Sequence, residues 1–141
     1  MTHKTILQWT GNDNFRTSFP AKTTNILHID VSAESANTYN PKPLMLAALG
    51  GCSAVDITSL MRKMRLEKSV SQFEIHIEAT LTTEHPKTYN YVKVNYIFTG
   101  NKLDETKLSK AVNLSKDRYC GVMEMFRQFA KVETAIIFKT V

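Results

Sequence analysis

The segment from Leu44 to Leu60 constrains the fold more than any other part of the chain, because its first half is apolar on every side. Pro43 suits the first turn of a helix, since the N–H that proline lacks would have no intrahelical partner there. Basic residues, which the helix dipole favours at a C-terminus, follow at positions 62, 63 and 65. A helix over 43–65 that begins apolar all round is expected to be buried at the centre of the molecule.

Two later segments predict a long antiparallel hairpin. Apolar and polar residues alternate strictly over 72–82, and the residues that share the apolar face are Phe73, Ile75, Ile77, Ala79 and Leu81. The return strand over 88–99 places Val92, Val94, Tyr96 and Phe98 on one face. A period of two with one polar face is typical of a strand that packs one side against a core.

The remaining segments complete an α+β fold. Short strands are expected at 5–9, 15–19 and 25–31, followed by an irregular loop at 32–42. Helices are expected at 104–115 and 119–130, separated by a break over 115–118 that offers N-cap residues, and a last strand at 133–140. Strands and helices are grouped rather than alternating, which indicates antiparallel sheet strands around the central helix. With 141 residues and no linker or repeat, we expect one domain over 1–141.

Composition excludes several classes of protein. Apolar residues make up 43% and charged residues 22%, as in ordinary soluble proteins, and two cysteines are too few for a disulfide-rich scaffold. The N-terminus has no apolar targeting segment and the stretch over 44–60 is short for a bilayer, so we expect a cytoplasmic protein that does not bind membranes. The net charge of +5 permits an anionic partner, but the basic run over 62–68 has no interleaved aromatics, so no nucleic-acid partner is expected.

The two cysteines are the leading candidates for a chemical site. Cys52 follows Gly50-Gly51 inside the apolar helix, where each glycine costs roughly 1 kcal/mol relative to alanine, a cost typical of places where a backbone or a ligand approaches closely. Cys120 is expected at the start of a helix, where thiols have lowered pKa values, with Lys116 and Arg118 adding positive charge. Alternatively, both cysteines are small buried apolar side chains, and their spacing does not decide between the two interpretations.

Asp56 lies four residues after Cys52 and therefore on the same face of the helix. A carboxylate on an apolar helix needs a partner, and we expect a lysine or arginine, the alternative being that Asp56 orients a base beside the thiol. The four histidines, His3, His28, His76 and His85, have no metal-ligand spacing with one another or with the cysteines, so no metal is expected. A glycine-rich phosphate loop is also missing, and no cofactor is expected.

Two motifs carry a resemblance to a known family. The segment Pro43–Asp56, PLMLAALGGCSAVD, resembles the first-cysteine helix of the OsmC/Ohr family. The segment Ala111–Cys120, AVNLSKDRYC, resembles its second-cysteine segment. The order of the elements also fits, so the resemblance covers essentially the whole chain. The nearest branch is the YhfA-like group of OsmC-related proteins rather than the best-characterised peroxidases.

The resemblance implies an intertwined homodimer with each site at the subunit interface. It also implies thiol-dependent reduction of hydroperoxides, organic ones especially, in defence against oxidative stress. In that chemistry Cys52 is the peroxidatic thiolate that becomes a sulfenic acid. Cys120 then condenses with it to a disulfide, and an external dithiol reductant restores the pair.

The sequence departs from the peroxidase branches of that family at two places. Those branches have an arginine in the N-terminal meander and a glutamate in the loop before the central helix. Here the glutamate position corresponds to Lys42, and the arginine position falls near Asn12, with Arg16 close but offset. Because a thiolate needs positive charge nearby, we take Arg16, Lys42 and Arg118, together with Asp56, as candidates for thiolate and peroxide support.

Two functions therefore stay open. The first is a cysteine-based hydroperoxide reductase that uses Cys52 and Cys120. The second is a non-catalytic module of the same fold that binds a small apolar ligand at the dimer interface, which the missing glutamate and the offset arginine favour. The distance between the two sulfur atoms discriminates them, because only a pair within disulfide reach supports the first.

Overall fold

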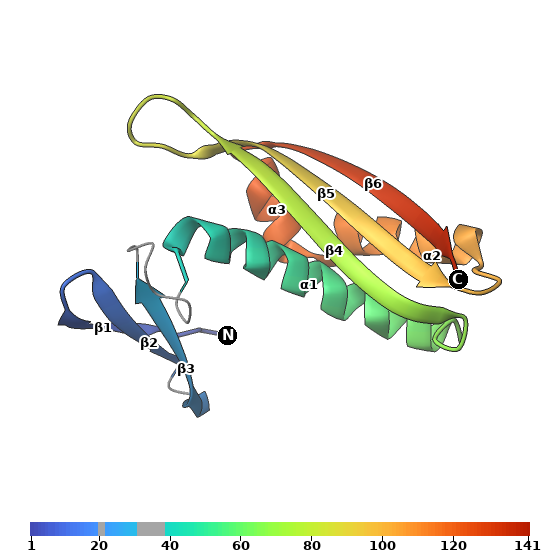
Figure 1. Ribbon diagram of the computed structural model, residues 1–141, viewed down its shortest axis with the longest axis horizontal. Helices are drawn as coiled ribbons and strands as arrows, with labels where there is room; N and C mark the ends of the chain where they lie inside the picture. The colour runs from blue at the N-terminus through green and yellow to red at the C-terminus, as the bar shows by residue number, and fades with distance from the viewer. Residues whose placement is uncertain (20–21, 31–38) are drawn as a thin grey trace. The chain divides into compact units, whose positions relative to one another are not determined.

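The computed structural model describes residues 1–19, 22–30 and 39–141 and divides the chain into two compact units, Met1–Ala47 and Ala48–Val141 (Figure 1). The first unit holds an antiparallel meander in the order β1-β2-β3, with β1 at Ile6–Gly11, β2 at Asn14–Phe19 and β3 at Lys22–Asp30. The three expected strands are confirmed, although β3 begins earlier than predicted. The expected end of that strand at Val31 and most of the loop predicted at 32–42 lie outside the described residues.

The second unit holds a three-stranded sheet with helices on one face. Its strands are β4 at Val70–Leu81, β5 at Tyr89–Gly100 and β6 at Lys131–Thr140, in the order β4-β5-β6. Helix α1, Pro41–Lys63, leads into this unit, and α2 at Glu105–Leu114 and α3 at Gly121–Arg127 follow β5. Figure 1 shows α1 and the α2–α3 segment under the same face of the sheet. The helices therefore share one core with the sheet.

The predicted hairpin is confirmed in its register. Phe73 pairs with Phe98, Ile77 with Val94, and the four residues expected on the core face of β5 are fully buried. The last strand departs from the antiparallel prediction, because β6 pairs with β5 in parallel. The α2–α3 segment carries the chain back along the helical face before β6 begins, so both strands run in the same direction.

Helix α1 buries one face only. Its buried residues recur every four positions, at Leu49, Ser53, Ile57 and Met61. Gly50 lies against β4 so closely that a Cβ atom there would meet Ile77 Cδ1 at 3.2 Å, which confirms the close approach expected at this glycine. At Gly51 nothing described lies within 4 Å of an added Cβ, so the same expectation is not met there within one chain.

The expectation that the first half of α1 is buried all round is wrong within one chain, since Met45 is 44% exposed and Ala47 and Ala48 are exposed as well. Val55, in the second half, is 69% exposed. Within the second unit, α1 faces the sheet and the segment that carries Cys120, and its outer face is not buried there. The expectation that this segment is short for a bilayer is also wrong, because α1 is long and apolar enough to cross one by length and composition alone. The core helix of a soluble protein can meet the same two criteria.

The break predicted over 115–118 is a π-helical turn instead. The segment η1, Ser115–Tyr119, continues directly from α2, and the Cys120 N–H donates to the Ser115 carbonyl at 2.8 Å, five residues back. The N-cap of α3 is Cys120 itself rather than one of the residues expected in the break. Such π-turns occur frequently at functional sites.

Candidate functional site

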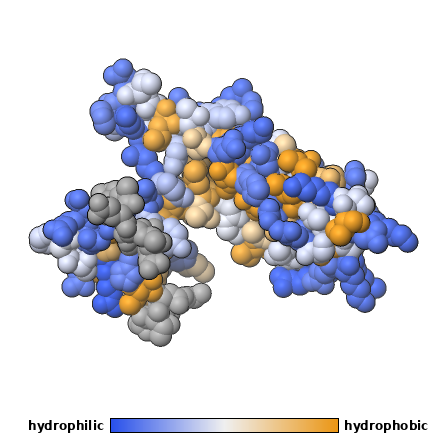
Figure 2. All heavy atoms as spheres, in the orientation of Figure 1, coloured by the Kyte–Doolittle hydropathy of each residue, from blue (hydrophilic) through white to orange (hydrophobic). Residues whose placement is uncertain are grey.

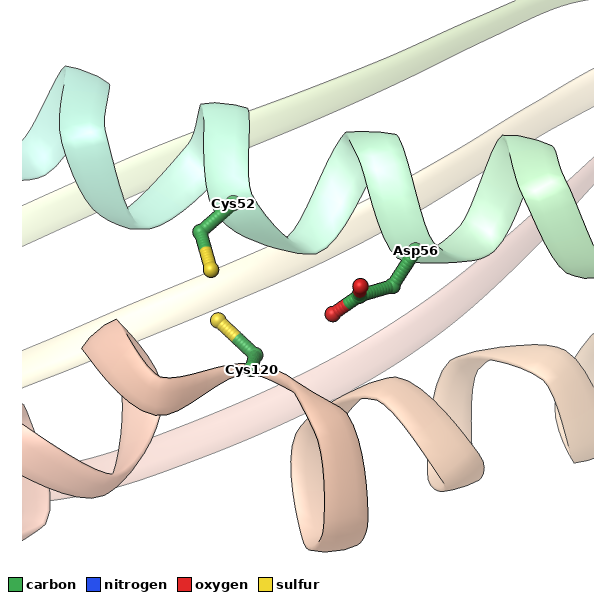
Figure 3. Close-up of side chains that lie close together, drawn as sticks. All are labelled: Cys52, Asp56 and Cys120. Carbon is green, nitrogen blue, oxygen red and sulfur yellow. The ribbon is translucent and has the colours of Figure 1, made fainter. Parts of the chain in front are cut away.

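The two cysteines meet in space within the second unit. Cys52 projects from α1, Cys120 from the junction of η1 and α3, and Asp56 from the next turn of α1 toward both (Figure 3). The two sulfur atoms and a carboxylate oxygen of Asp56 all lie within 4.8 Å of one another. Both thiols are free, Cys52 is partly exposed and Cys120 is buried. The site is thus a reduced dithiol with a carboxylate beside it.

Cys120 is held by hydrogen bonds to its sulfur. The Ser53 hydroxyl donates to Cys120 Sγ at 3.5 Å, and the backbone N–H of Met123 donates to the same atom at 3.3 Å. Burial nevertheless raises the pKa of the Cys120 thiol, and the two donors lower it only in part. The lowered pKa expected at this helix start is therefore wrong, because desolvation of the thiolate outweighs the hydrogen bonds.

Asp56 is positioned by a hydroxyl. The Ser115 side chain donates to Asp56 Oδ2 at 3.2 Å, from the first residue of η1. The lysine or arginine partner expected for Asp56 does not appear among its interactions in the described part of the chain, so that expectation is wrong. The carboxylate is left partly exposed, on the rim of a pocket of about 360 Å³ that Ser59, Leu60, Lys63 and Tyr119 also line.

A tyrosine from the sheet completes the buried side of the site. Tyr96 on β5 is fully buried, and burial raises the pKa of its phenol while the Ser53 side chain lowers it in part. Charge on Cys120 also acts on that phenol, so the two groups lie close enough to influence each other. The sequence analysis placed Tyr96 on the core face but gave it no part in the site.

Sequence reasoning also missed both serines that hold the site. Ser53 falls in the four-residue period of the buried face of α1, between Leu49 and Ile57. Ser115 is buried in the same way after Ala111 and Val112. A hydroxyl in an apolar row must find a hydrogen-bond partner, and this signal was available in the sequence.

The remaining candidates are three basic residues. Arg118 is exposed on η1 and lines a separate open pocket of about 660 Å³ with Glu105 and Asp117. Arg16 is exposed on β2 and Lys42 is exposed in the first turn of α1, both in the first unit. Their role as thiolate and peroxide support stays a prediction.

Comparison with known proteins settles the family. The family model for OsmC-like proteins matches residues 32–135, a range that includes both cysteines. The chain belongs to the OsmC-like family. This OsmC-like chain is 30% identical over 93 residues to Protein YhfA of Escherichia coli strain K12, covering 66% of the chain and 68% of that relative.

Solved structures support the fold of this OsmC-like protein. A hypothetical protein from Aquifex aeolicus VF5 superposes with a TM-score of 0.85 at 23% identity, covering 100% of this chain and 98% of the other. The organic hydroperoxide resistance protein OhrB of Bacillus subtilis is more distant, with a TM-score of 0.63 at 17% identity over 96% of this chain and 98% of the other. The predicted α+β OsmC-like fold is therefore confirmed, and the Ohr proteins are distant structural neighbours.

Proposed function

We propose that this OsmC-like protein reduces hydroperoxides with the Cys52–Cys120 pair. The observation that carries the proposal is that the two reduced sulfur atoms lie within 4.8 Å, one partly exposed and one buried. A disulfide requires an S–S distance near 2.05 Å, so closure needs a movement of at most roughly 3 Å, within the range of side-chain rotation and small backbone shifts. Cys52, which is partly exposed, reacts with the substrate, and the buried Cys120 then reacts with Cys52.

The proposed chemistry has two steps on the protein. The Cys52 thiolate attacks one oxygen of the hydroperoxide, the O–O bond breaks, and the products are a Cys52 sulfenic acid and an alkoxide that takes up a proton to become an alcohol. The Cys120 sulfur then attacks the Cys52 sulfur. An S–S bond forms, the S–O bond breaks, and the hydroxide leaves as water with the proton of the Cys120 thiol.

An external dithiol closes the cycle. It attacks the Cys52–Cys120 disulfide, passes through a mixed disulfide and leaves oxidised, with both protein thiols restored. Such reductants and reduced thiols are characteristic of the cytoplasm, which is where we propose that the protein works.

Asp56 and Ser53 have separate roles in this proposal. The Asp56 carboxylate lies within 4.8 Å of both sulfurs and on the rim of the pocket, where it takes the proton from the Cys52 thiol and returns it to the leaving oxygen. Ser53 donates to Cys120 Sγ and stabilises the negative charge that develops on this sulfur as its proton leaves in the second step.

The test is hydroperoxide consumption by purified reduced protein with an excess dithiol. With the dithiol we expect wild type to consume an organic hydroperoxide and Cys52→Ser to be inactive. After the dithiol is removed, Cys120→Ser is expected to consume one equivalent and to hold Cys52 as a sulfenic acid. Brief oxidation of wild type is expected to give one intramolecular disulfide by mass spectrometry. If wild type consumes peroxide no faster than Cys52→Ser, the proposal fails, and a co-purifying ligand in native mass spectrometry would then favour the binding module.

We also propose that the chain works as a homodimer. Val55 and Met45 on α1 are exposed apolar side chains, and orange hydrophobic surface is visible over the larger unit in Figure 2. The first unit supports the same proposal, because its buried residues among those described are Thr17 and Asp30, both polar. A three-stranded sheet without a buried apolar face needs a cover, and a second copy of the chain supplies one.

A further inference from the structure

We propose that Cys52, Asp56 and Cys120 also form a binding site for a thiophilic divalent metal ion, with Zn²⁺ as the ion that fits best. The three ligand atoms, two sulfurs and one carboxylate oxygen, lie within 4.8 Å of one another and point toward a common centre (Figure 3). The sequence predicted no metal, because spacing arguments look for histidines and neighbouring cysteines. Here the ligands come from two segments 68 residues apart that the fold brings together.

The geometry needs little change to bind the ion. With Zn–S bonds of about 2.3 Å and Zn–O bonds of about 2.1 Å, ligand atoms around a tetrahedral zinc are separated by roughly 3.5–3.8 Å. Contraction by at most about 1 Å therefore converts the present cluster into three corners of a tetrahedron. Cys52 and Asp56 lie one helical turn apart on a rigid helix, so Cys120, at the junction of η1 and α3, is the ligand that moves most.

Outer hydrogen bonds orient the ligands. Ser115 donates to Asp56 Oδ2, which fixes one carboxylate oxygen and leaves the other free for a metal. Ser53 and the Met123 N–H donate to Cys120 Sγ, the arrangement that stabilises a metal-bound thiolate. Such hydrogen bonds fix the orientation of the metal ligands, and loss of one partner typically lowers metal affinity by about 10–100-fold.

A tetrahedral ion held by three protein ligands has a fourth position for water. Asp56 lines a pocket together with Lys63, so solvent reaches the carboxylate side of the cluster. Two thiolates and one carboxylate leave the bound ion with a net charge of −1, which the ammonium of Lys63 offsets in part. Two sulfur ligands select Zn²⁺ over Mg²⁺ or Ca²⁺, which prefer oxygen.

A metal at this place has a direct chemical consequence. Binding removes one proton from each thiol that is protonated in the free protein, and it occupies the electron pairs with which the thiolates attack a peroxide. Zn²⁺ is therefore expected to block oxidation of the pair. The proposed metal site does not require peroxidase activity, so the two proposals can be tested independently.

The test uses reduced, chelator-washed protein titrated with Zn²⁺ by calorimetry in two buffers of different ionisation enthalpy, and with Co²⁺ by absorption. We expect one ion per chain, proton release on binding, and with Co²⁺ a thiolate-to-cobalt charge-transfer band together with the intense visible bands of a tetrahedral site. Asp56→Asn is expected to weaken Zn²⁺ binding by about 100-fold, and Ser115→Ala by about 10-fold. Glu67→Gln, an exposed carboxylate outside the cluster, is the matched control and is expected to bind as wild type does.

Three results would overturn the site. The first is no charge-transfer band with Co²⁺ in the folded wild type. The second is unchanged Zn²⁺ affinity in the double variant Cys52→Ser, Cys120→Ser, which would place the ion on surface histidines. The third is equal affinity for Asp56→Asn and Glu67→Gln, which would remove the carboxylate from the ligand set. Circular dichroism of each variant verifies that the fold is retained.

Discussion

A single buried sulfur shows how opposing effects act on one group. Cys120 is only 4% exposed, so its thiolate would lose most of its hydration, while Ser53 and Met123 return two hydrogen bonds. Desolvation is the larger effect, and the pKa of the thiol is raised. A resolving cysteine does not need to be a strong nucleophile in the resting protein, because the sulfenic acid it attacks lies within a few ångströms.

The raised pKa predicts how stability changes with pH. A thiol whose pKa is higher in the folded than in the unfolded chain binds its proton more tightly when folded, so its contribution is fully present below the unfolded pKa of about 8.5 and is lost as pH rises through the folded value. We expect the free energy of unfolding to fall above about pH 8.5, with a slope of at most about 1.4 kcal/mol per pH unit from this group.

Urea unfolding of the reduced protein at a series of pH values measures that slope. Cys120→Ala removes the group and is expected to give a shallower fall between pH 8.5 and 10, whatever its stability at pH 7. Tyr89 and Tyr96 also have raised pKa values, but tyrosine titrates near 10, so their effect begins at higher pH. Parallel curves for wild type and Cys120→Ala would contradict the prediction.

At the level of elements, the tightest constraint lies where β5 ends. A Cβ atom on Gly100 would lie 1.9 Å from the carbonyl oxygen of Ser69, which is backbone that enters β4 and cannot rotate away. The same oxygen accepts a hydrogen bond from the Asn101 N–H at 3.1 Å. Any side chain at Gly100 must therefore separate the two strand ends.

We expect Gly100→Ala to destabilise the protein by about 1–3 kcal/mol, the usual cost of forcing atoms into a packed site. Gly121→Ala is the matched control, because nothing lies within 4 Å of the added methyl group and alanine favours the first turn of α3. We expect the thermal unfolding midpoint to fall in Gly100→Ala, and to rise or stay unchanged in Gly121→Ala. A Gly100→Ala protein as stable as wild type would mean that the strand ends separate easily.

Some features of the helices and strands can be predicted from the sequence, and others cannot. The hairpin was predicted down to its core face because a two-residue period is written directly in residues 72–99. The direction of β6 was not, since alternation is the same for parallel and antiparallel strands. The sequence predicts a break where the π-turn η1 lies, because the hydrogen bond that stabilises it, from the Cys120 N–H to the Ser115 carbonyl, joins backbone groups that no side-chain pattern reveals.

Sequence also predicts only part of the candidate site. The cysteines were identified from their motifs, but their proximity depends on how α1 and the α2–α3 segment share one face of the sheet. The Ser115 hydroxyl donates to Asp56 from the first residue of the π-turn. Spacing in the sequence therefore does not show that the partner of Asp56 is a hydroxyl rather than a lysine or arginine. The sequence therefore identifies the reactive residue types, but not which residues from distant segments lie next to one another.

For the whole molecule, the proposed homodimer makes a prediction about the exposed face of α1. Val55 is 69% exposed within one chain, and in a two-fold dimer the same patch of both copies meets itself. Val55→Glu would then place two carboxylates in one apolar contact. With a cost of at least about 2 kcal/mol for burying a charge, we expect dimerisation to weaken by about 30-fold or more.

Sedimentation equilibrium over a range of concentrations measures this change. Wild type is expected to be a dimer whose unfolding midpoint rises with protein concentration, because folding and association are then linked. Val141→Glu is the matched control, since Val141 is 80% exposed and follows β6 rather than lying on α1. A monomeric wild type would refute the dimer outright. A wild-type dimer that Val55→Glu leaves intact would place the interface on another surface, and the exposed strands of the first unit would be the next to test.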